Sequence, residues 1–473
     1  MPVTSRIFIV FLSLAATGLD ILATLRLDGQ KYAAAGIVMA IAIPICALGL
    51  IYLSVTLPGY IVNRLALELG LLLLLVPTVE IGLTAFAWTS PSIAEIRRFR
   101  TADRLGVPFD HRFKSQVVDD LRARGLRAYP SIPRDMLVGA NVKERVGFSL
   151  YPLSEVANSI IVECNETGQF LTYESDELGF NNPHGLFSSG KIDVAVIGSS
   201  YTVGQCVPAD RGYVDLLRHR YPRTLNFGIA GSHAPTMLAT LLEYVQGLRP
   251  ALVIWEMHSG SFELYELNDP TINRYLDNFR YRNTSYSQHL LERRTEVDEF
   301  LRDVVTPLQW ERDQVLADDI AIAHRQRWRQ LAHLPLLREK LNQALAGIIF
   351  RPQSFYKYDW DGTVAIIKIV KELVESWGGH LVVVLIPTIE VAVPNQFAAA
   401  EDKANAYVLN LLKSTQVHII NGIPYFRGQP DPAALFGWGM QNHFSEEGHR
   451  LFAELIDADL RVTYPELMTA ARR

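Results

Sequence analysis

A serine and a histidine occupy settings that suit a nucleophile and its base. Ser200 follows the apolar run 193–197 in a Gly-Ser-Ser turn, and His443 stands just before the last segment with helical spacing. A serine hydroxyl is a poor nucleophile until a base takes its proton, and histidine is the commonest base. The pair therefore predicts nucleophilic catalysis by Ser200, whereas each residue alone would also suit a tight turn or a solvated loop. His449 falls inside the helix and is expected either to pack or to be solvated.

An alternating series of strands and helices must position this pair. The expected strands are 193–197, 224–227, 251–255, 380–386 and 417–420, and the expected helices are 213–220, 236–248, 364–377, 398–412 and 446–460. Such alternation predicts an α/β fold with a mostly parallel, doubly wound sheet, whose ligands bind beyond the carboxyl ends of the strands. Residues 262–345 interrupt the pattern with charge and leucine at helical spacing, which predicts a helical insertion.

The first 90 residues differ in composition from the remainder. They carry eight charged side chains, whereas the whole chain has 45 lysines and arginines and 50 aspartates and glutamates. Three apolar runs, 7–25, 32–57 and 65–88, approach the ~20 residues that cross a ~30 Å hydrocarbon core as a helix. We therefore predict three transmembrane helices within residues 1–90. The first is expected to stay uncleaved, because Asp20 and Arg26 lie where a signal-peptide cleavage site would be.

The remainder is predicted to contain a stalk or linker over residues 91–144, followed by an α/β domain over residues 145–465. With three spans, this domain lies on the opposite side of the membrane from the N-terminus. The lysines and arginines near the spans favour an internal domain, whereas the chemistry considered below favours an external one. The orientation stays open at this point.

Charge and cysteine content exclude several classes of function. The net charge of −5, without basic blocks, argues against a nucleic-acid partner. Three cysteines are too few for a disulfide-dense scaffold, and no CxxC or HExxH spacing suggests a metal site, so neither metal nor cofactor is expected. Cys164 and Cys206 flank Ser200 in the sequence. They could form a disulfide suited to an oxidising periplasm or remain two buried thiols.

Four segments carry a family resemblance: Gly198-Ser-Ser-Tyr-Thr-Val-Gly204, Asn226-Phe-Gly-Ile-Ala-Gly231, Val253-Ile-Trp-Glu-Met-His-Ser-Gly-Ser261 and His443-Phe-Ser-Glu-Glu-Gly-His449. They resemble the sequence blocks of the SGNH/GDSL hydrolases, which are serine esterases and O-acyl transferases with a flavodoxin-like three-layer fold. The lead-in from Cys164 is similar to a membrane-linked bacterial branch of that family. The resemblance covers about residues 145–460 without the insertion. It implies Ser200 as nucleophile, His443 as base, and the N–H groups of Ser200 and Gly231 as oxyanion donors.

The segments depart from the family pattern at three positions. Ser199 stands where the first block has aspartate, and Ser261 aligns with an asparagine that donates to the oxyanion, a role its hydroxyl could take. The aspartate expected two or three residues before the histidine falls on Gln441 or Met440. Neither side chain stabilises an imidazolium by charge, so a serine–histidine dyad is predicted. Loss of this aspartate can cost about 10⁴ in rate.

Two functions fit these features. The first is a serine esterase or O-acyl transferase anchored in the bacterial inner membrane, with a periplasmic domain that acts on acyl esters of an envelope glycan or lipid. Membrane anchoring favours such a substrate over a cytosolic metabolite, which is an argument from context and not from the site. The second is a catalytically degraded SGNH domain that serves as an interaction or assembly subunit of a membrane complex. The three departures and the long insertion favour this second function.

Overall fold

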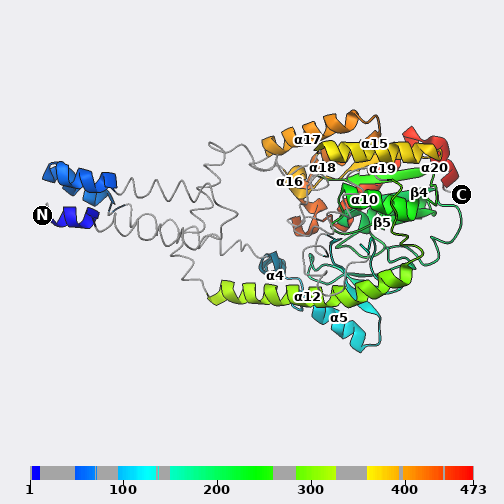
Figure 1. Cartoon of the computed structure of the whole chain (residues 1–473), viewed down its shortest axis with the longest axis horizontal. Helices are drawn as coiled ribbons and strands as arrows, with labels where there is room; N and C mark the ends of the chain where they lie inside the picture. Colours follow the sequence, from blue (N-terminus) through cyan, green and yellow to red (C-terminus); the bar gives the residue numbers. More distant parts are fainter. Residues whose placement is uncertain are drawn as a thin grey trace. The chain divides into compact units, whose positions relative to one another are not determined.

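Figure 1 shows the fold in a computed structural model of the whole chain. The structure describes residues 3–10, 48–69, 71, 94–134, 137, 150–258, 284–325, 360–393, 398–439 and 443–471. The chain divides into two compact units, of which the first is Met1–Pro91 with Ala323–Arg351 and the second is Ser92–Ile322 with Pro352–Arg473. Ser200 and His443 both belong to the second unit.

The described residues of the first unit include helices over 3–10, 48–56 and 59–69. The Arg6 guanidinium donates to the carbonyl of Val55 at 2.9 Å, which joins the first helix to the second. Within the described ranges, no helix has both the length and the apolar character needed to cross a membrane. Most of the three predicted transmembrane segments lies outside the described residues.

The second unit is built on a five-stranded parallel sheet. Its strands are β4 (Val194–Gly198), β5 (Thr224–Gly228), β6 (Leu252–Met257), β7 (His380–Leu385) and β8 (His418–Asn421). They lie in the order β5-β4-β6-β7-β8, and each neighbouring pair is parallel. Counted along the chain from β4, this is the flavodoxin-like order 2-1-3-4-5. The predicted α/β fold with a parallel sheet is confirmed.

The alternation of side chains along each strand separates two buried faces of this sheet. Ala195 and Ile197 point to one core, whereas Val194 and Val196 point to the other. The first core includes side chains of α10 (Ala234–Thr240), α12 (Arg294–Arg325), α15 (Trp360–Ser376) and α17 (Ala398–Lys413). The second includes side chains of α9 (Tyr213–Arg220), α18 (Gly422–Arg427), α19 (Glu446–Thr463) and α20 (Pro465–Ala471). Burial on both faces explains why the strands are mostly apolar runs.

A smaller sheet precedes the large one along the chain. Its β1 (Ala128–Pro130) pairs in parallel with β2 (Ile160–Val162), which pairs antiparallel with β3 (Thr172–Glu174). The loop from residue 163 to 171 joins β2 to β3 and carries Cys164 and Glu166. This loop becomes important for the site.

The described part of the predicted stalk belongs to the second unit. It contains α4 (Ala94–Leu105) and α5 (Lys114–Ala123). The N–H of Ser115 donates to Asp313 of α12 at 2.8 Å, and Val117 and Val118 pack in a small core with β1 and β2. The apolar face of α5 is therefore buried against the small sheet, and its N-terminal end is hydrogen-bonded to α12.

The described part of the predicted insertion, residues 284–325, agrees with the expected helix. Most of it is α12, which packs on the first face of the sheet through residues such as Val297, Leu301 and Val305. The remainder of the insertion, and Ser261 directly before it, lie outside the described residues.

Candidate active site

Ser200 begins the short helix α8 (Ser200–Val203), two residues beyond the end of β4. The turn is tight, since a Cβ on Gly198 would lie 2.0 Å from the hydroxyl oxygen of Thr202, so only glycine fits there. Gly204 then ends the helix in the left-handed conformation with φ 82°. The sequence of this turn therefore holds Ser200 at the carboxyl edge of the large sheet, where α/β folds bind their ligands.

His443 lies directly before α19, and its neighbours hold it there. Phe444 forms an antiparallel bridge with Phe436, and the Ser445 hydroxyl caps α19 by accepting the N–H of Gly448 at 3.2 Å. The Nε2 atom of His443 lies 2.9 Å from Oγ of Ser200. The structure thus brings together the predicted nucleophile and base, although 243 positions separate them in the sequence.

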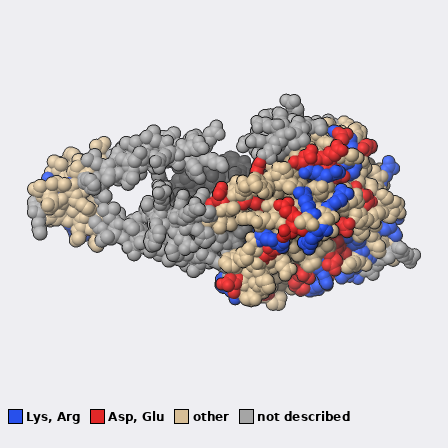
Figure 2. All heavy atoms as spheres, turned by 90° about the horizontal axis from the view of Figure 1, so that it is seen from below, with Lys and Arg blue, Asp and Glu red and all other residues tan. Residues whose placement is uncertain are grey.

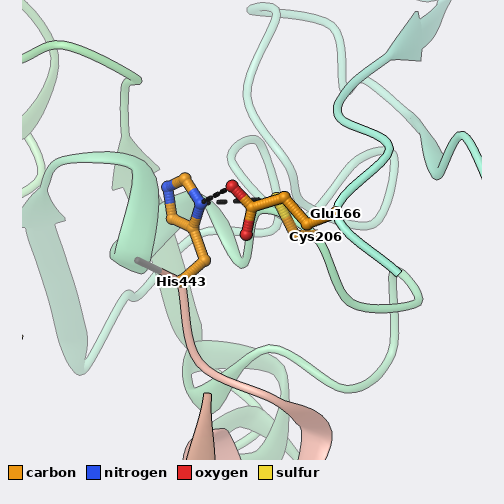
Figure 3. A group of neighbouring side chains, drawn as sticks. All are labelled: Glu166, Cys206 and His443. Carbon is orange, nitrogen blue, oxygen red and sulfur yellow. Dashed lines mark hydrogen bonds and ion pairs between the residues drawn. The ribbon is translucent and has the colours of Figure 1, made fainter. Parts of the chain in front are cut away.

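Glu166 extends this pair to a chain of three residues. Its Oε1 lies 2.9 Å from Nδ1 of His443, the ring nitrogen that faces away from Ser200 (Figure 3). A carboxylate at Nδ1 keeps the proton on that nitrogen and leaves Nε2 free to accept the serine proton. The structure therefore corrects the predicted dyad. The acid does not precede the histidine but comes from the β2–β3 loop, 277 positions away.

Glu166 is ionised in this setting. Burial by itself would raise its pKa, but the charge of His443, the hydrogen bond from its ring and the charge of Arg98 together outweigh burial, so the pKa lies below the ordinary value of 4.5. The Arg98 Nη2 atom of α4 lies 3.6 Å from Glu166 Oε1. The carboxylate can therefore stabilise the imidazolium that forms when His443 takes a proton.

A disulfide joins Cys164 and Cys206, the pair for which the sequence left two alternatives open. The Cys206 sulfur lies 3.4 Å from Nδ1 of His443, on the same side of the ring as Glu166 (Figure 3). Three atoms that could bind a metal ion, one each from Glu166, Cys206 and His443, lie within 4.8 Å of one another. Because the sulfur is bonded to Cys164, it offers no thiolate to a cation, and the group is organised around a proton instead.

The loop after β5 lies beside the nucleophile turn. Gly198 and Gly228 are partners in the parallel pairing of β4 and β5, and the N–H of Ile229 donates to the Gly198 carbonyl at 3.0 Å. Gly231 adopts φ 71°, a left-handed conformation that favours glycine. This places Gly231 at the edge where the predicted oxyanion donor is needed. Ser261, the other predicted donor, lies outside the described residues.

Solved structures of several esterases are similar to the chain, whereas no protein-family model and no curated protein matches it. A lipase/acylhydrolase from Enterococcus faecalis is 11% identical, with 57% of this chain and 96% of that chain covered and a TM-score of 0.31. An acetylxylan esterase from Geobacillus stearothermophilus is 14% identical, with 59% and 97% covered and a TM-score of 0.30. A protein from Desulfitobacterium hafniense described as lipolytic and of the G-D-S-L family is 11% identical, with 57% and 99% covered and a TM-score of 0.30.

The strand order and the order of the site residues along it decide the fold. The nucleophile turn follows β4, the Gly231 loop follows β5 and His443 precedes α19, all at a sheet of flavodoxin-like order. The α/β domain has the flavodoxin-like fold that the resemblance to the SGNH hydrolases implies. The resemblance of the sequence blocks is therefore confirmed for the fold.

The α/β domain has a second carboxyl group directly under the nucleophile turn. Glu256 of β6 is fully buried and accepts the Ser199 N–H at 2.6 Å, the Ser199 hydroxyl at 2.9 Å and the Thr202 hydroxyl at 2.8 Å. Ser199 stands where the first SGNH block has aspartate, so here a neighbouring strand supplies the carboxyl group. Glu256 is an isolated acid in an apolar run, and the sequence contains no signal for its partners.

We expect Glu256→Gln to change how stability depends on pH. Burial raises the pKa of Glu256 above 4.5, although the hydrogen bonds from Ser199 and Thr202 oppose this. A group whose folded pKa is raised contributes stability below its unfolded pKa, and this contribution is lost as the pH rises through the folded value. Glutamine keeps the shape and does not ionise. The melting temperature of the wild type should therefore fall relative to that of the variant as the pH is raised above 4.5.

Glu299→Gln, at an exposed position of α12, is the matched control for this comparison. Its melting temperature should follow that of the wild type over the same pH range. A Glu256→Gln variant that loses stability relative to the wild type as the pH rises would contradict the prediction.

Tyr201 lies between His443 and His258 in the α/β domain. The ring centroid of Tyr201 lies 5.4 Å from that of His443 and 5.9 Å from that of His258. Burial, and then repulsion by His443, lower the pKa of His258 to about 4, so His258 is neutral at pH 7. Trp255 is fully buried in the core, and His449 packs inside α19, where its Nδ1 accepts the first N–H of α9.

Proposed function

We propose that the protein is a serine esterase or O-acyl transferase that acts on acyl esters through Ser200, His443 and Glu166. One observation carries this proposal, namely the continuous hydrogen-bond chain of 2.9 Å from Ser200 Oγ to His443 Nε2 and 2.9 Å from His443 Nδ1 to Glu166 Oε1. The chain supplies a nucleophile, a base and a charged group that orients the base.

The geometry assigns a step to each group. His443 Nε2 takes the proton from Ser200 Oγ while the oxygen bonds to the acyl carbon, and Glu166 stabilises the imidazolium that results. The N–H groups of Ser200 and Gly231 are proposed to stabilise the oxyanion. Collapse of this intermediate breaks the ester C–O bond, and His443 returns its proton to the leaving alcohol. Water or an acceptor hydroxyl then releases the acyl group from Ser200 by the same steps in reverse.

Two of the three departures from the family pattern, which favoured a degraded domain, are compensated by other described residues. Glu166 takes the place of the acid missing before His443, and Glu256 provides a carboxyl group beside Ser199. A chain that had lost its activity would have no need to hold a buried, ionised carboxylate against a histidine, because burial of an unpaired charge is costly. These two groups support the catalytic proposal over the assembly role.

The proposed substrate is an acyl ester of an envelope glycan or lipid. This choice rests on the predicted membrane anchor and on the Cys164–Cys206 disulfide, which suits an oxidising compartment such as the periplasm. On the face of the protein in Figure 2, positively and negatively charged side chains are intermixed. The described part of this face therefore has no large patch of one charge sign that would bind a highly charged polymer.

A fluorophosphonate probe tests the proposed function directly. Wild-type protein in detergent should become labelled on Ser200 and should release p-nitrophenol from p-nitrophenyl acetate, whereas Ser200→Ala should do neither. Ser414→Ala, at an exposed serine just after α17, is the matched control and should behave as the wild type. Absence of label on Ser200, together with equal hydrolysis by wild type and Ser200→Ala, would reject the proposal.

A further inference from the structure

The acid of the triad reaches the site from a different part of the fold than its two partners. Ser200 and His443 stand at the edge of the five-stranded sheet, whereas Glu166 lies in the loop between β2 and β3. Each of these two strands has only three residues. The position of Glu166 therefore depends on how this loop is attached to the nucleophile turn.

The Cys164–Cys206 disulfide makes that attachment. Cys164 stands two positions before Glu166 in the loop, and Cys206 follows the nucleophile helix α8. The N–H of Gln205 donates to the carbonyl of Ser200 at 3.0 Å, which holds the residue next to Cys206 close to the nucleophile. Cys164 is thus close to Glu166 along the chain, and Cys206 is held close to Ser200 through the hydrogen bond of Gln205.

The backbone conformation and the contacts of Cys206 indicate that this part of the chain is arranged around the disulfide. Its φ of 69° is left-handed, a conformation that residues other than glycine adopt rarely and at a cost. The Glu163 carboxyl receives a hydrogen bond from the backbone N–H of Cys206. The sulfur lies 3.4 Å from Nδ1 of His443, beside the 2.9 Å contact of Glu166 with the same atom (Figure 3). The disulfide therefore bounds the space in which the carboxylate and the imidazole meet.

Other contacts hold the small sheet but attach the loop elsewhere. Ile161 and Tyr173 of β2 and β3 pack against Val203 of α8, so the strands stay docked without the disulfide. Within the loop, the Asn165 side chain donates to the carbonyl of Asp110 at 2.8 Å. Together with the Arg98–Glu166 ion pair, this contact ties the loop to residues 98–110. The hydrogen bond from Cys206 to Glu163 links only the first residue of the loop to the chain that follows the nucleophile helix, three positions before Glu166. Loss of the disulfide should therefore leave the fold intact and weaken the attachment of the loop near Glu166.

We propose that the Cys164–Cys206 disulfide is a positioning group of the triad, which holds Glu166 at the distance from His443 that catalysis requires. The proposal rests on the proposed function. An added dithiol that reduces the disulfide supplies two electrons and two protons, leaves two thiols and becomes a disulfide itself. The freed loop then no longer fixes the carboxylate, and a displacement of about 1 Å can cost about 10²-fold in rate. The site is fully assembled only in the oxidised protein.

A double-mutant cycle on the full chain tests this role. The variants are Cys164→Ser with Cys206→Ser, Glu166→Gln, and all three substitutions together, and the readouts are kcat and KM for p-nitrophenyl acetate and the rate of fluorophosphonate labelling. Removal of the disulfide should lower kcat by about 10-fold to 10²-fold in the wild-type background, with KM little changed. In the Glu166→Gln background the same removal should change kcat by less than about twofold, since the group being positioned is gone.

The outcomes separate the two proposals. An equal loss in both backgrounds would mean that the disulfide supports the fold in general, and this would overturn its role toward Glu166. An unchanged kcat without the disulfide would overturn it as well. Hydrolysis and labelling that survive Ser200→Ala would instead reject the proposed function. Treatment of the wild type with dithiothreitol should reproduce the loss, and the variant with both cysteines replaced should not respond.

Discussion

Substitution of Ser200 or His443 by alanine is expected to lower kcat for ester hydrolysis by up to about 10⁶-fold, and the double variant should be no worse than either single one. The reason is that the two side chains act as a unit. Without Nε2 of His443 at 2.9 Å, the serine hydroxyl keeps its proton, and without the hydroxyl the base has no proton to take. Steady-state hydrolysis of p-nitrophenyl acetate by the two single variants and the double variant measures this directly.

His449→Gln is the matched control for His443→Ala, because His449 is buried in α19 and contacts the backbone of α9. It should lower the melting temperature and leave kcat close to the wild-type value. Losses at Ser200 and His443 that simply multiply in the double variant would show that the residues act independently, and would contradict their assignment as nucleophile and base.

The sequence contained enough information for the sheet and for two residues of the site. Strands buried on both faces are short, continuous apolar runs, and such runs at 194–198 and 380–385 need no further context to be found. The turn around Ser200 has glycines at Gly198 and Gly204, where the structure requires a close approach and a left-handed conformation. Apolar runs and turn glycines are both local features, so they can be recognised from the spacing of residues along the chain.

The third residue of the site could not be found in this way. Glu166 meets His443 across 277 positions, through a small sheet whose three-residue strands are too short for a clear periodic signal. The expected place for the acid, two or three residues before His443, holds Gln441 and Met440, which led to the prediction of a dyad. One usable signal was present. Cys164 lies two positions before Glu166, and Cys206 lies close after the nucleophile turn, so a disulfide between them would have drawn that acid toward the site.

Substitution of Glu166 by glutamine should lower kcat by about 10⁴-fold while KM stays nearly constant. The amide has the size of the carboxylate but no charge, and its NH₂ group can donate to Nδ1, which would put the ring proton on Nε2. In that tautomer His443 faces Ser200 with a donor and cannot take the serine proton. The measurement is kcat and KM for p-nitrophenyl acetate.

Glu174→Gln is the matched control for Glu166→Gln, because Glu174 is exposed at the end of β3 in the same small sheet. It should retain wild-type kinetics. A Glu166→Gln variant with wild-type kcat would show that the 2.9 Å contact with Nδ1 does not contribute to catalysis, and His443 would then act in the dyad that the sequence predicted. A 10⁴-fold loss with an unchanged melting temperature would instead separate catalysis from folding, since a buried carboxylate that merely stabilised the fold would affect both.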